Sequence, residues 1–407
     1  MEKNNIPQDG PLLIIANHSA SFLDAMIVGS YLDRPIHFYV RSDIFKLGIV
    51  RFFLNLLHMI PIYSKELGKG EMHRNEESFK RGEEVLSNNG ALLIFPEGLS
   101  RIERNLMPFK KGVSRTILYT LRNHPDLQIT VVPLGIHFNA HEFRSDLYLI
   151  AGEPFRITQF TFPITNTGST LTQITDALFT VFEKVALYVE NQKRYQFLDQ
   201  VLYMNDNDRA KEYDINSFMV QRRICSWVDQ LEDQDYSFKK NTLEEYKQEL
   251  KELGLKDRSF SKSSFLRFNY FFLIASSPVC ILGALSTWLP YFIGKFIAKK
   301  TVTRKDFYTS VLVSVCAVLY LLWFLFGLYL FLTYTGILGI IFWLLTPYMG
   351  WYSIQWVDTY KSYIADKRFS ELDKKDVELV TRLRWMRSMV LLNEPKDVFL
   401  SDESTIS

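Results

Sequence analysis

The stretch IIANHSASFLDAMIVG, residues 14–29, decides how the first part of this chain is expected to fold. It begins as an apolar, β-branched run that is typical of a buried strand, and a helical pattern starts at Phe22. Between the strand and the helix lies Asn17-His18-Ser19, and Asp24 follows six residues after His18. Open α/β sheets bind their ligands at the carboxyl ends of strands, so this junction is a candidate site for a histidine and carboxylate pair.

Short apolar runs alternate with helical patterns over residues 1–160, which is typical of a βαβ-type sheet covered by helices. Strands are expected at residues 11–16, 37–41, 59–63, 91–96, 130–138 and 147–151. Helices are expected at residues 22–32, 43–57, 74–88, 110–122 and 174–189. We therefore predict an α/β domain over residues 1–190, with a mixed sheet flanked by helices.

Length and composition limit the classes of function. At 407 residues the chain is too long for one ordinary domain. Its 47 basic and 45 acidic residues produce no strong overall field, so no nucleic-acid partner is indicated. Three widely spaced cysteines support neither a disulfide framework nor a metal site. Six of the seven Trp residues lie in the last third of the chain, which indicates a lipid environment there.

The second half of the chain changes from charged to apolar. Residues 191–264 are charged and helical in pattern, which predicts a helical connector. Residues 265–357 are expected to form an α-helical membrane region, because 307–357 lacks charged residues and is long enough for two transmembrane helices with a turn near 333–336. Residues 358–407 are expected to form a cytoplasmic helical tail. The alternative is a buried helical hairpin in a soluble protein.

The first apolar stretch, residues 268–294, has two interpretations. It also lacks charged residues, but Pro278 and Pro290 interrupt it, and basic residues flank it on both sides. Because Lys and Arg favour the cytoplasmic side, both flanks are expected there, which favours a re-entrant or interfacial hairpin over a simple span. The chain is therefore expected to be an integral membrane protein whose first domain lies on the cytoplasmic face.

Two segments at strand ends carry residue types that suit chemistry. An imidazole can take the proton of an attacking hydroxyl, and a carboxylate on its other nitrogen fixes the tautomer and stabilises the imidazolium. A single histidine–carboxylate pair at this spacing is more often structural than catalytic. The segment FPEGLSR, residues 95–101, ends another expected strand and combines an acidic residue, a glycine and a cation, which suits a phosphate-bearing substrate.

Four segments, taken in order, resemble the sequence blocks of the glycerolipid acyltransferase family. They are NHSASFLD (17–24), MIPIYSK (59–65), FPEGLSR (95–101) and VVPLGIHF (131–138), and the resemblance runs from about Ile6 to Phe155. It implies a glycerolphosphate acyltransferase-like fold. It also implies transfer of a fatty acyl chain from acyl-CoA or acyl carrier protein to the hydroxyl of glycerol 3-phosphate or a lyso-glycerophospholipid, in phospholipid biosynthesis, with no cofactor and no metal.

The resemblance also assigns roles to residues. His18 is expected to be the general base and Asp24 the residue that orients it. Arg101 is the expected phosphate ligand because its guanidinium can bind two oxygens at once. The residues expected to bind substrate are Asn17, Lys65, Glu97, Gly98, Ser100, Arg101 and Pro133.

Three departures from the family pattern bear on these roles. Five residues separate His18 from Asp24 where four are usual, so the turn before the helix must absorb one residue. Lys65 stands beside the position where the family has an arginine, and a lysine supplies a point charge without the fork. Leu99 lies between Gly98 and Ser100, which leaves the register of the following arginine open.

Two other functions remain open. One is a phospholipid–lysophospholipid transacylase that uses the same His18 and Asp24. The other is a catalytically dead, lipid-binding membrane scaffold, against which the joint presence of His18, Asp24, Glu97 and Gly98 argues. A transporter is disfavoured, because the apolar stretches contain no charged residue to line an ion pathway.

Overall fold

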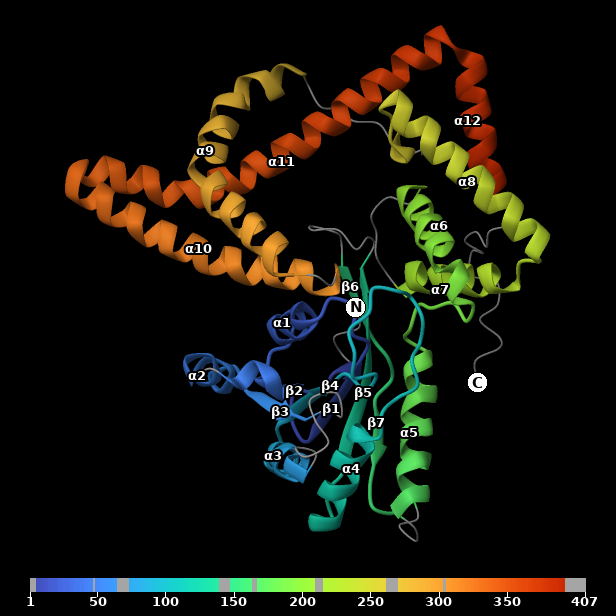
Figure 1. Ribbon diagram of the computed structural model, residues 1–407, viewed down its shortest axis with the longest axis vertical. Helices are drawn as coiled ribbons and strands as arrows, with labels where there is room; N and C mark the ends of the chain where they lie inside the picture. The colour runs from blue at the N-terminus through green and yellow to red at the C-terminus, as the bar shows by residue number, and fades with distance from the viewer. Residues whose placement is uncertain are drawn as a thin grey trace. The chain divides into compact units, whose positions relative to one another are not determined.

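The computed structural model describes residues 5–46, 48–63, 73–138, 147–162, 167–208, 215–260, 270–302 and 305–391. The chain forms two compact units (Figure 1). The first comprises residues 1–195 and 213–225 and contains the sheet, whereas the second comprises residues 196–212 and 226–407 and is helical. The predicted connector, residues 191–264, is thus divided between the two units.

The first unit is built on a seven-stranded mixed sheet with the order β3-β2-β4-β1-β5-β6, and β7 also pairs with β5. The strands are β1 (Leu12–Ala16), β2 (Ile36–Arg41), β3 (Met59–Ile62), β4 (Ala91–Ile94), β5 (Ile129–Phe138), β6 (Leu147–Ala151) and β7 (Phe155–Ile157). Strands β1 to β5 pair in parallel, and β6 and β7 lie antiparallel to β5. The predicted mixed sheet is confirmed, although the three-residue β7 is too short to show an alternating pattern.

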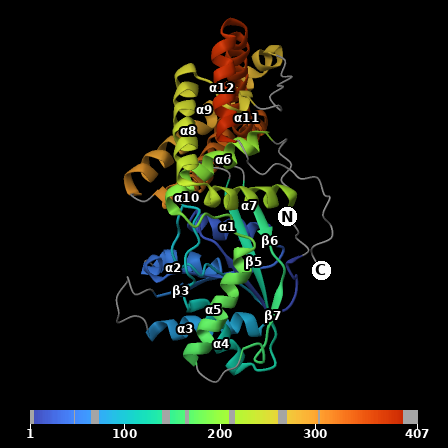
Figure 2. The ribbon, with the colours of Figure 1, turned by 90° about the vertical axis from the view of Figure 1, so that its right-hand side faces the viewer.

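Helices cover both faces of this sheet. On one face α1 (Phe22–Tyr31) and α2 (Gly48–Leu56) pack on the side chains of β1, β4 and β5 that alternate toward them. On the other side lie α3 (Asn75–Ser87) and α4 (Gly112–Asn123) (Figure 2). The predicted helix 43–57 is instead a 3-10 turn, η2 (Ser42–Lys46), followed by α2, because the weak helix former Gly48 starts the second piece.

The helix that follows the sheet, α5 (Thr167–Glu183), lies earlier than the predicted helix 174–189. Its buried positions Ile174, Leu178 and Phe182 follow the helical period as expected. Residues 185–189 are also largely buried, but they form an extended segment beyond the helix. Their apolar character therefore reflects burial against β5 and the loop of Arg104 and not another helical turn, and the segment contributes to the candidate site.

Outside its three long apolar helices, the second unit is held together by a buried arginine. Arg387 donates through Nε to Asp257 at 2.8 Å and through Nη1 to Asp208 at 2.9 Å, while Tyr246 donates to Asp257 at 2.8 Å. These contacts join four elements into one cluster. They are α6 (Tyr195–Asp208), α8 (Asp233–Leu253), η6 (Asp257–Phe260) and α12 (Val377–Val390). The 3-10 turn η5 (Gln192–Arg194) precedes α6, and α7 (Ile215–Gln230) is shared by the two units.

Three further helices of the second unit are long and apolar enough to cross a membrane. They are α9 (Tyr270–Thr301), α10 (Lys305–Tyr334) and α11 (Gly336–Lys375), whose last part carries the charged start of the predicted tail. The turn between α10 and α11 lies where it was predicted, and Gly336 adopts the φ of +67° that a side chain would strain. Pro278 and Pro290, which were expected to interrupt the first apolar stretch, lie inside one continuous helix, α9.

The continuity of α9 has a local cause. A proline lacks the N–H that would bond the carbonyl four residues earlier, so each proline leaves one carbonyl without its helical partner. The carbonyl freed by Pro278 accepts the hydroxyl of Ser277 at 2.8 Å. The carbonyl of Ser286, freed by Pro290, accepts the indole N–H of Trp323 in α10 at 2.8 Å. Side-chain donors thus replace the lost bonds, and the helix continues through both prolines.

Candidate active site

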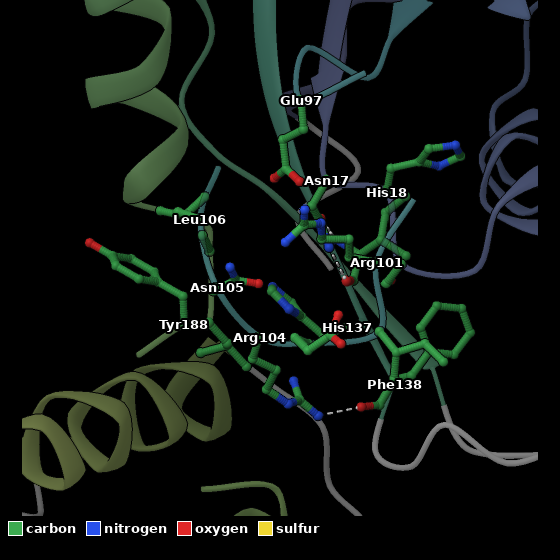
Figure 3. Close-up of a pocket in the computed structure, with 16 residues that line it drawn as sticks. Asn17, His18, Glu97, Arg101, Arg104, Asn105, Leu106, His137, Phe138 and Tyr188 are labelled. Carbon is green, nitrogen blue, oxygen red and sulfur yellow. Dashed lines mark hydrogen bonds between the residues drawn. The ribbon is translucent and has the colours of Figure 1, made fainter. Parts of the chain in front are cut away.

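Three neighbouring parallel strands, β1, β4 and β5, end at one pocket in the first unit (Figure 3). Its walls come from residues 17–19, 97, 101–106, 136–138 and 186–188. The structure therefore brings together four of the residues predicted from sequence, namely Asn17, His18, Glu97 and Arg101. Carboxyl ends of parallel strands are where open α/β sheets place their ligands.

His18 and Asp24 meet as the sequence predicts. The Nδ1 atom of His18 lies 3.0 Å from Oδ2 of Asp24, whose side chain is fully buried while that of His18 is 19% exposed. The same carboxylate oxygen accepts the Ala20 N–H at 2.8 Å, which fixes Asp24 as an acceptor. A proton on Nδ1 then completes the contact and leaves Nε2 of His18 as the basic nitrogen.

The extra residue between His18 and Asp24 is absorbed at Ser21. This residue takes φ +54° and ψ −133° immediately before α1, a conformation that side chains rarely adopt. Its N–H donates to the hydroxyl of Ser100 at 3.1 Å, so the loop after β4 holds the strained turn in place. Ser100 therefore braces the His18 loop, and it is not among the residues that line the pocket.

The loop after β4 is also fixed against His18 itself. The Arg101 N–H donates to the His18 carbonyl at 2.8 Å, and the ring of Phe95 stacks on the imidazole at a centroid distance of 4.1 Å. Gly98 has φ +71°, and the side chain of Lys110 fills the space that a Cβ there would occupy. The positive φ favours glycine at this turn, whereas the Lys110 side chain is flexible and could move aside.

Glu97 is a buried carboxyl group with a perturbed pKa. Its side chain is 7% exposed, and burial raises its pKa to about 7, with Arg101 opposing this shift and Asp24 adding to it. Near neutral pH the protonated form of the group is therefore populated. A carboxyl group in that state can donate a hydrogen bond to a substrate oxygen or accept one from a hydroxyl.

The raised pKa of Glu97 predicts a pH-dependent stability. Because the folded protein keeps a proton that the unfolded chain releases above about pH 4.5, wild type is expected to lose up to about 3 kcal/mol as pH rises from about 4.5 to 7. Glu97→Gln removes this group's contribution. Urea unfolding of both proteins at about pH 5 and about pH 8 measures it, and a constant difference between the proteins would contradict the buried, proton-holding carboxyl.

The other predicted substrate residues have structural contacts. The amide of Asn17 donates to the Ile136 carbonyl at 2.8 Å and accepts the Ile136 N–H at 2.7 Å, which ties the end of β1 to β5. Pro133 lies within β5 and pairs with Ile15 of β1. On the other side of β5, the pairing with β7 ends at Val131 and the pairing with β6 begins at Leu134. A proline, which has no N–H, is tolerated between these two pairings. Lys65 lies outside the described residues.

Sequence reasoning missed several residues that line the pocket, among them Arg104, His137 and Tyr188 (Figure 3). Arg104 donates to the Phe138 carbonyl at 2.6 Å, and its place in the same loop as Arg101 is a signal that could have been used. His137 contacts the Val185 carbonyl through Nε2 at 2.8 Å, and burial lowers its pKa to about 3, so it is a neutral donor. Tyr188 had no such signal, because its segment resembled a helix.

Comparisons with known proteins point to one family. Residues 1–137 match the family model described as Acyltransferase. The chain is 40% identical over 75 residues to glycerol-3-phosphate O-acyltransferase 1 of Saccharomyces cerevisiae and 33% identical over 121 residues to glycerol-3-phosphate O-acyltransferase 2 of the same yeast. A chloroplastic 1-acyl-sn-glycerol-3-phosphate acyltransferase of Brassica napus is 28% identical over 109 residues.

These matches cover 18%, 28% and 26% of this chain, and 10%, 16% and 30% of the respective relatives. Among solved structures, the 1-acyl-sn-glycerophosphate acyltransferase PlsC of Thermotoga maritima aligns with a TM-score of 0.33 at 18% identity, over 46% of this chain and 69% of that one. The sequence matches to these relatives therefore span a small part of their length.

Proposed function

From the premise that residues 1–137 form a domain of the glycerolipid acyltransferase family, we propose that this chain is a membrane-bound O-acyltransferase of phospholipid synthesis. Its donor is acyl-CoA or acyl carrier protein, and its acceptor is the hydroxyl of glycerol 3-phosphate or of a lyso-glycerophospholipid. The reaction uses no cofactor and no metal, because a general base and a thioester suffice for acyl transfer. The contact between His18 and Asp24 is the observation that carries the proposal.

The transfer step follows from the order of these two side chains. Nε2 of His18 takes the proton of the acceptor hydroxyl as its oxygen attacks the thioester carbonyl, and a C–O bond forms while the C–S bond breaks. The thiolate that leaves takes the proton back from the imidazolium. Asp24 stabilises the positive imidazolium in between, and its burial and the Ala20 N–H keep it in place for this role.

Arg101 and Glu97 are proposed to hold the acceptor. The two side chains line the same pocket as His18, and Arg101 has the planar fork that matches phosphate oxygens. Glu97, with its pKa of about 7, is suited to a hydroxyl of the acceptor because it can donate or accept a hydrogen bond. Arg104 adds a second cation to the wall of the pocket.

The three apolar helices support the proposal that the protein is embedded in a bilayer. We place the catalytic unit on the cytoplasmic face, because basic residues precede the first apolar stretch, on the side of the chain that holds this unit. Lys and Arg next to a membrane segment favour the cytoplasmic side. An enzyme embedded in a membrane can bind a lyso-lipid acceptor at the bilayer surface and release its lipid product there.

Product analysis by mass spectrometry tests the proposed function. Detergent-solubilised protein receives a long-chain acyl thioester and one acceptor at a time, either glycerol 3-phosphate or a lyso-glycerophospholipid. Formation of lysophosphatidic acid identifies the first acceptor, and formation of a diacyl lipid from the lyso-lipid identifies the second. Acyl exchange between lipids without a thioester would indicate the transacylase instead, and lipid binding without any product would indicate the scaffold.

A further inference from the structure

The segments that flank the three apolar helices are in contact with one another. Before α9, Asp257 of η6 binds Arg387 of α12, which follows α11. Lys239 of α8 donates to the Met389 carbonyl at 2.7 Å, and Ser259 donates to Asp366 in the charged end of α11 at 3.0 Å. Contacts between buried charges cannot extend across a bilayer, so the chain before α9 and the chain after α11 lie on one side. The number of complete crossings is therefore even, although three helices are long enough to cross.

The first half of α9 runs toward the turn between α10 and α11. The Leu273 carbonyl accepts the indole N–H of Trp356 at 3.0 Å, and further along α9 a Cβ on Gly283 would collide with the Met349 carbonyl. As the residue number rises along α9, the partner on α11 therefore moves back toward Gly336. This half of α9 therefore lies antiparallel to α11. It starts near the charged end of α11 and enters the bilayer from that side.

The second half of α9 runs away from the same turn. The Ser286 carbonyl accepts the indole N–H of Trp323 at 2.8 Å, and the next carbonyl accepts the hydroxyl of Tyr320 at 2.8 Å. Gly294 then lies against Cys316, where a Cβ would meet the sulfur. The partner on α10 thus moves back toward the beginning of that helix, and α9 leaves on the side from which it entered.

The point of return has a structural cause and a defined depth. Pro290 frees the Ser286 carbonyl, and prolines are where helices bend; Figure 1 shows α9 as a curved ribbon across α10 and α11. Beyond Trp323, α10 continues for 11 residues to Tyr334, which at 1.5 Å per residue is about 17 Å. The innermost part of α9 therefore stops about half the thickness of a hydrocarbon core short of the turn.

We infer that α9 is a re-entrant helix that enters a single leaflet of the bilayer and returns, and that only α10 and α11 cross. Its outer side chains, among them Phe271, Leu285 and Phe292, are exposed and face the lipid of that leaflet. Lys295, Lys299 and Lys300 at its end then return to the aqueous side from which the helix entered, in agreement with the basic residues that precede it. The inference rests on the proposal that the protein is embedded in a bilayer, but not on its acyltransferase activity.

Single cysteines report the side of each segment. In the full chain with its three native cysteines replaced by alanine, one cysteine is introduced at Lys256, Lys300, Tyr334 or Lys374, all exposed and all outside the candidate active site. Sealed vesicles with the protein in one known orientation, and a second preparation with the opposite orientation, are treated separately with a membrane-impermeant maleimide. We expect the variants at Lys256, Lys300 and Lys374 to react from one side and the variant at Tyr334 from the opposite side.

Three complete crossings give a different pattern. The variant at Lys300 would then react from the side opposite to Lys256, and Tyr334 from the same side as Lys256, which overturns the inference. Reaction of all four variants from one side also overturns it, because no helix then crosses. Labelling of every variant in detergent confirms that each cysteine is reactive, and release of the protein by alkaline carbonate would refute the membrane proposal itself, independently of activity.

Discussion

Replacing His18 with alanine is expected to lower the rate of acyl transfer by about 10²- to 10⁴-fold, which is the usual contribution of a positioned general base. The structure supports this expectation because His18 lines the pocket and its ring has a fixed orientation. Asp24 holds its Nδ1 atom at 3.0 Å, and Phe95 stacks on its face. The rate of product formation at saturating concentrations of thioester and acceptor, followed by mass spectrometry, measures the change in kcat.

A matched control is available in the same unit. His124 lies 2.9 Å from Glu83, so it forms a second histidine and carboxylate pair of similar geometry, but neither residue lines the pocket. His124→Ala is expected to leave kcat unchanged. Asp24→Asn is expected to lose activity as well, because the amide favours the wrong tautomer of His18. A His18→Ala protein as active as wild type would refute the proposed base, provided that it unfolds at the same temperature as wild type.

Local sequence patterns predicted the centre of the sheet because its central strands are buried on both faces. Runs such as Leu12–Ala16 and Ala91–Ile94 are apolar throughout, as a central parallel strand requires, and their ends are marked by polar residues. The same patterns placed His18 and Glu97 at the ends of two strands, which the structure shows to be neighbours. Four residues of the pocket were therefore predictable from short segments, whereas Arg104, His137 and Tyr188 were not predicted.

What sequence did not predict depends on contacts between distant residues. The turn at Ser21 is held by Ser100, which lies 79 residues away, so the spacing alone left the meeting of His18 and Asp24 open. The continuity of α9 depends on Trp323, a donor in another helix. Tyr188 enters the pocket on a segment whose apolar residues fit a helix equally well. In each case a partner far along the chain decides between local alternatives.

Replacing Arg387 with methionine is expected to have the largest effect on stability. The guanidinium is 11% exposed and binds Asp257 and Asp208, and it also donates to the Met204 carbonyl at 3.1 Å. Methionine fills a similar volume but leaves the buried Asp257 carboxylate without its counter-charge. Removing one partner of a buried ion pair typically costs about 3–5 kcal/mol, and we expect a loss of this size for the second unit.

Unfolding of the full chain in detergent, followed by tryptophan fluorescence, measures this loss, and Arg382→Met is the matched control. Arg382 lies on the same helix and also binds a carboxylate, Glu249, but its side chain is 55% exposed, so solvent already screens the pair. We expect its unfolding temperature to stay close to that of wild type. Arg387→Met combined with Asp257→Asn should recover part of the loss, because the second change removes the unpaired charge. If the two single variants unfolded alike, the buried cluster would not be what holds α12 against η6, and the argument for an even number of crossings would lose its strongest contact.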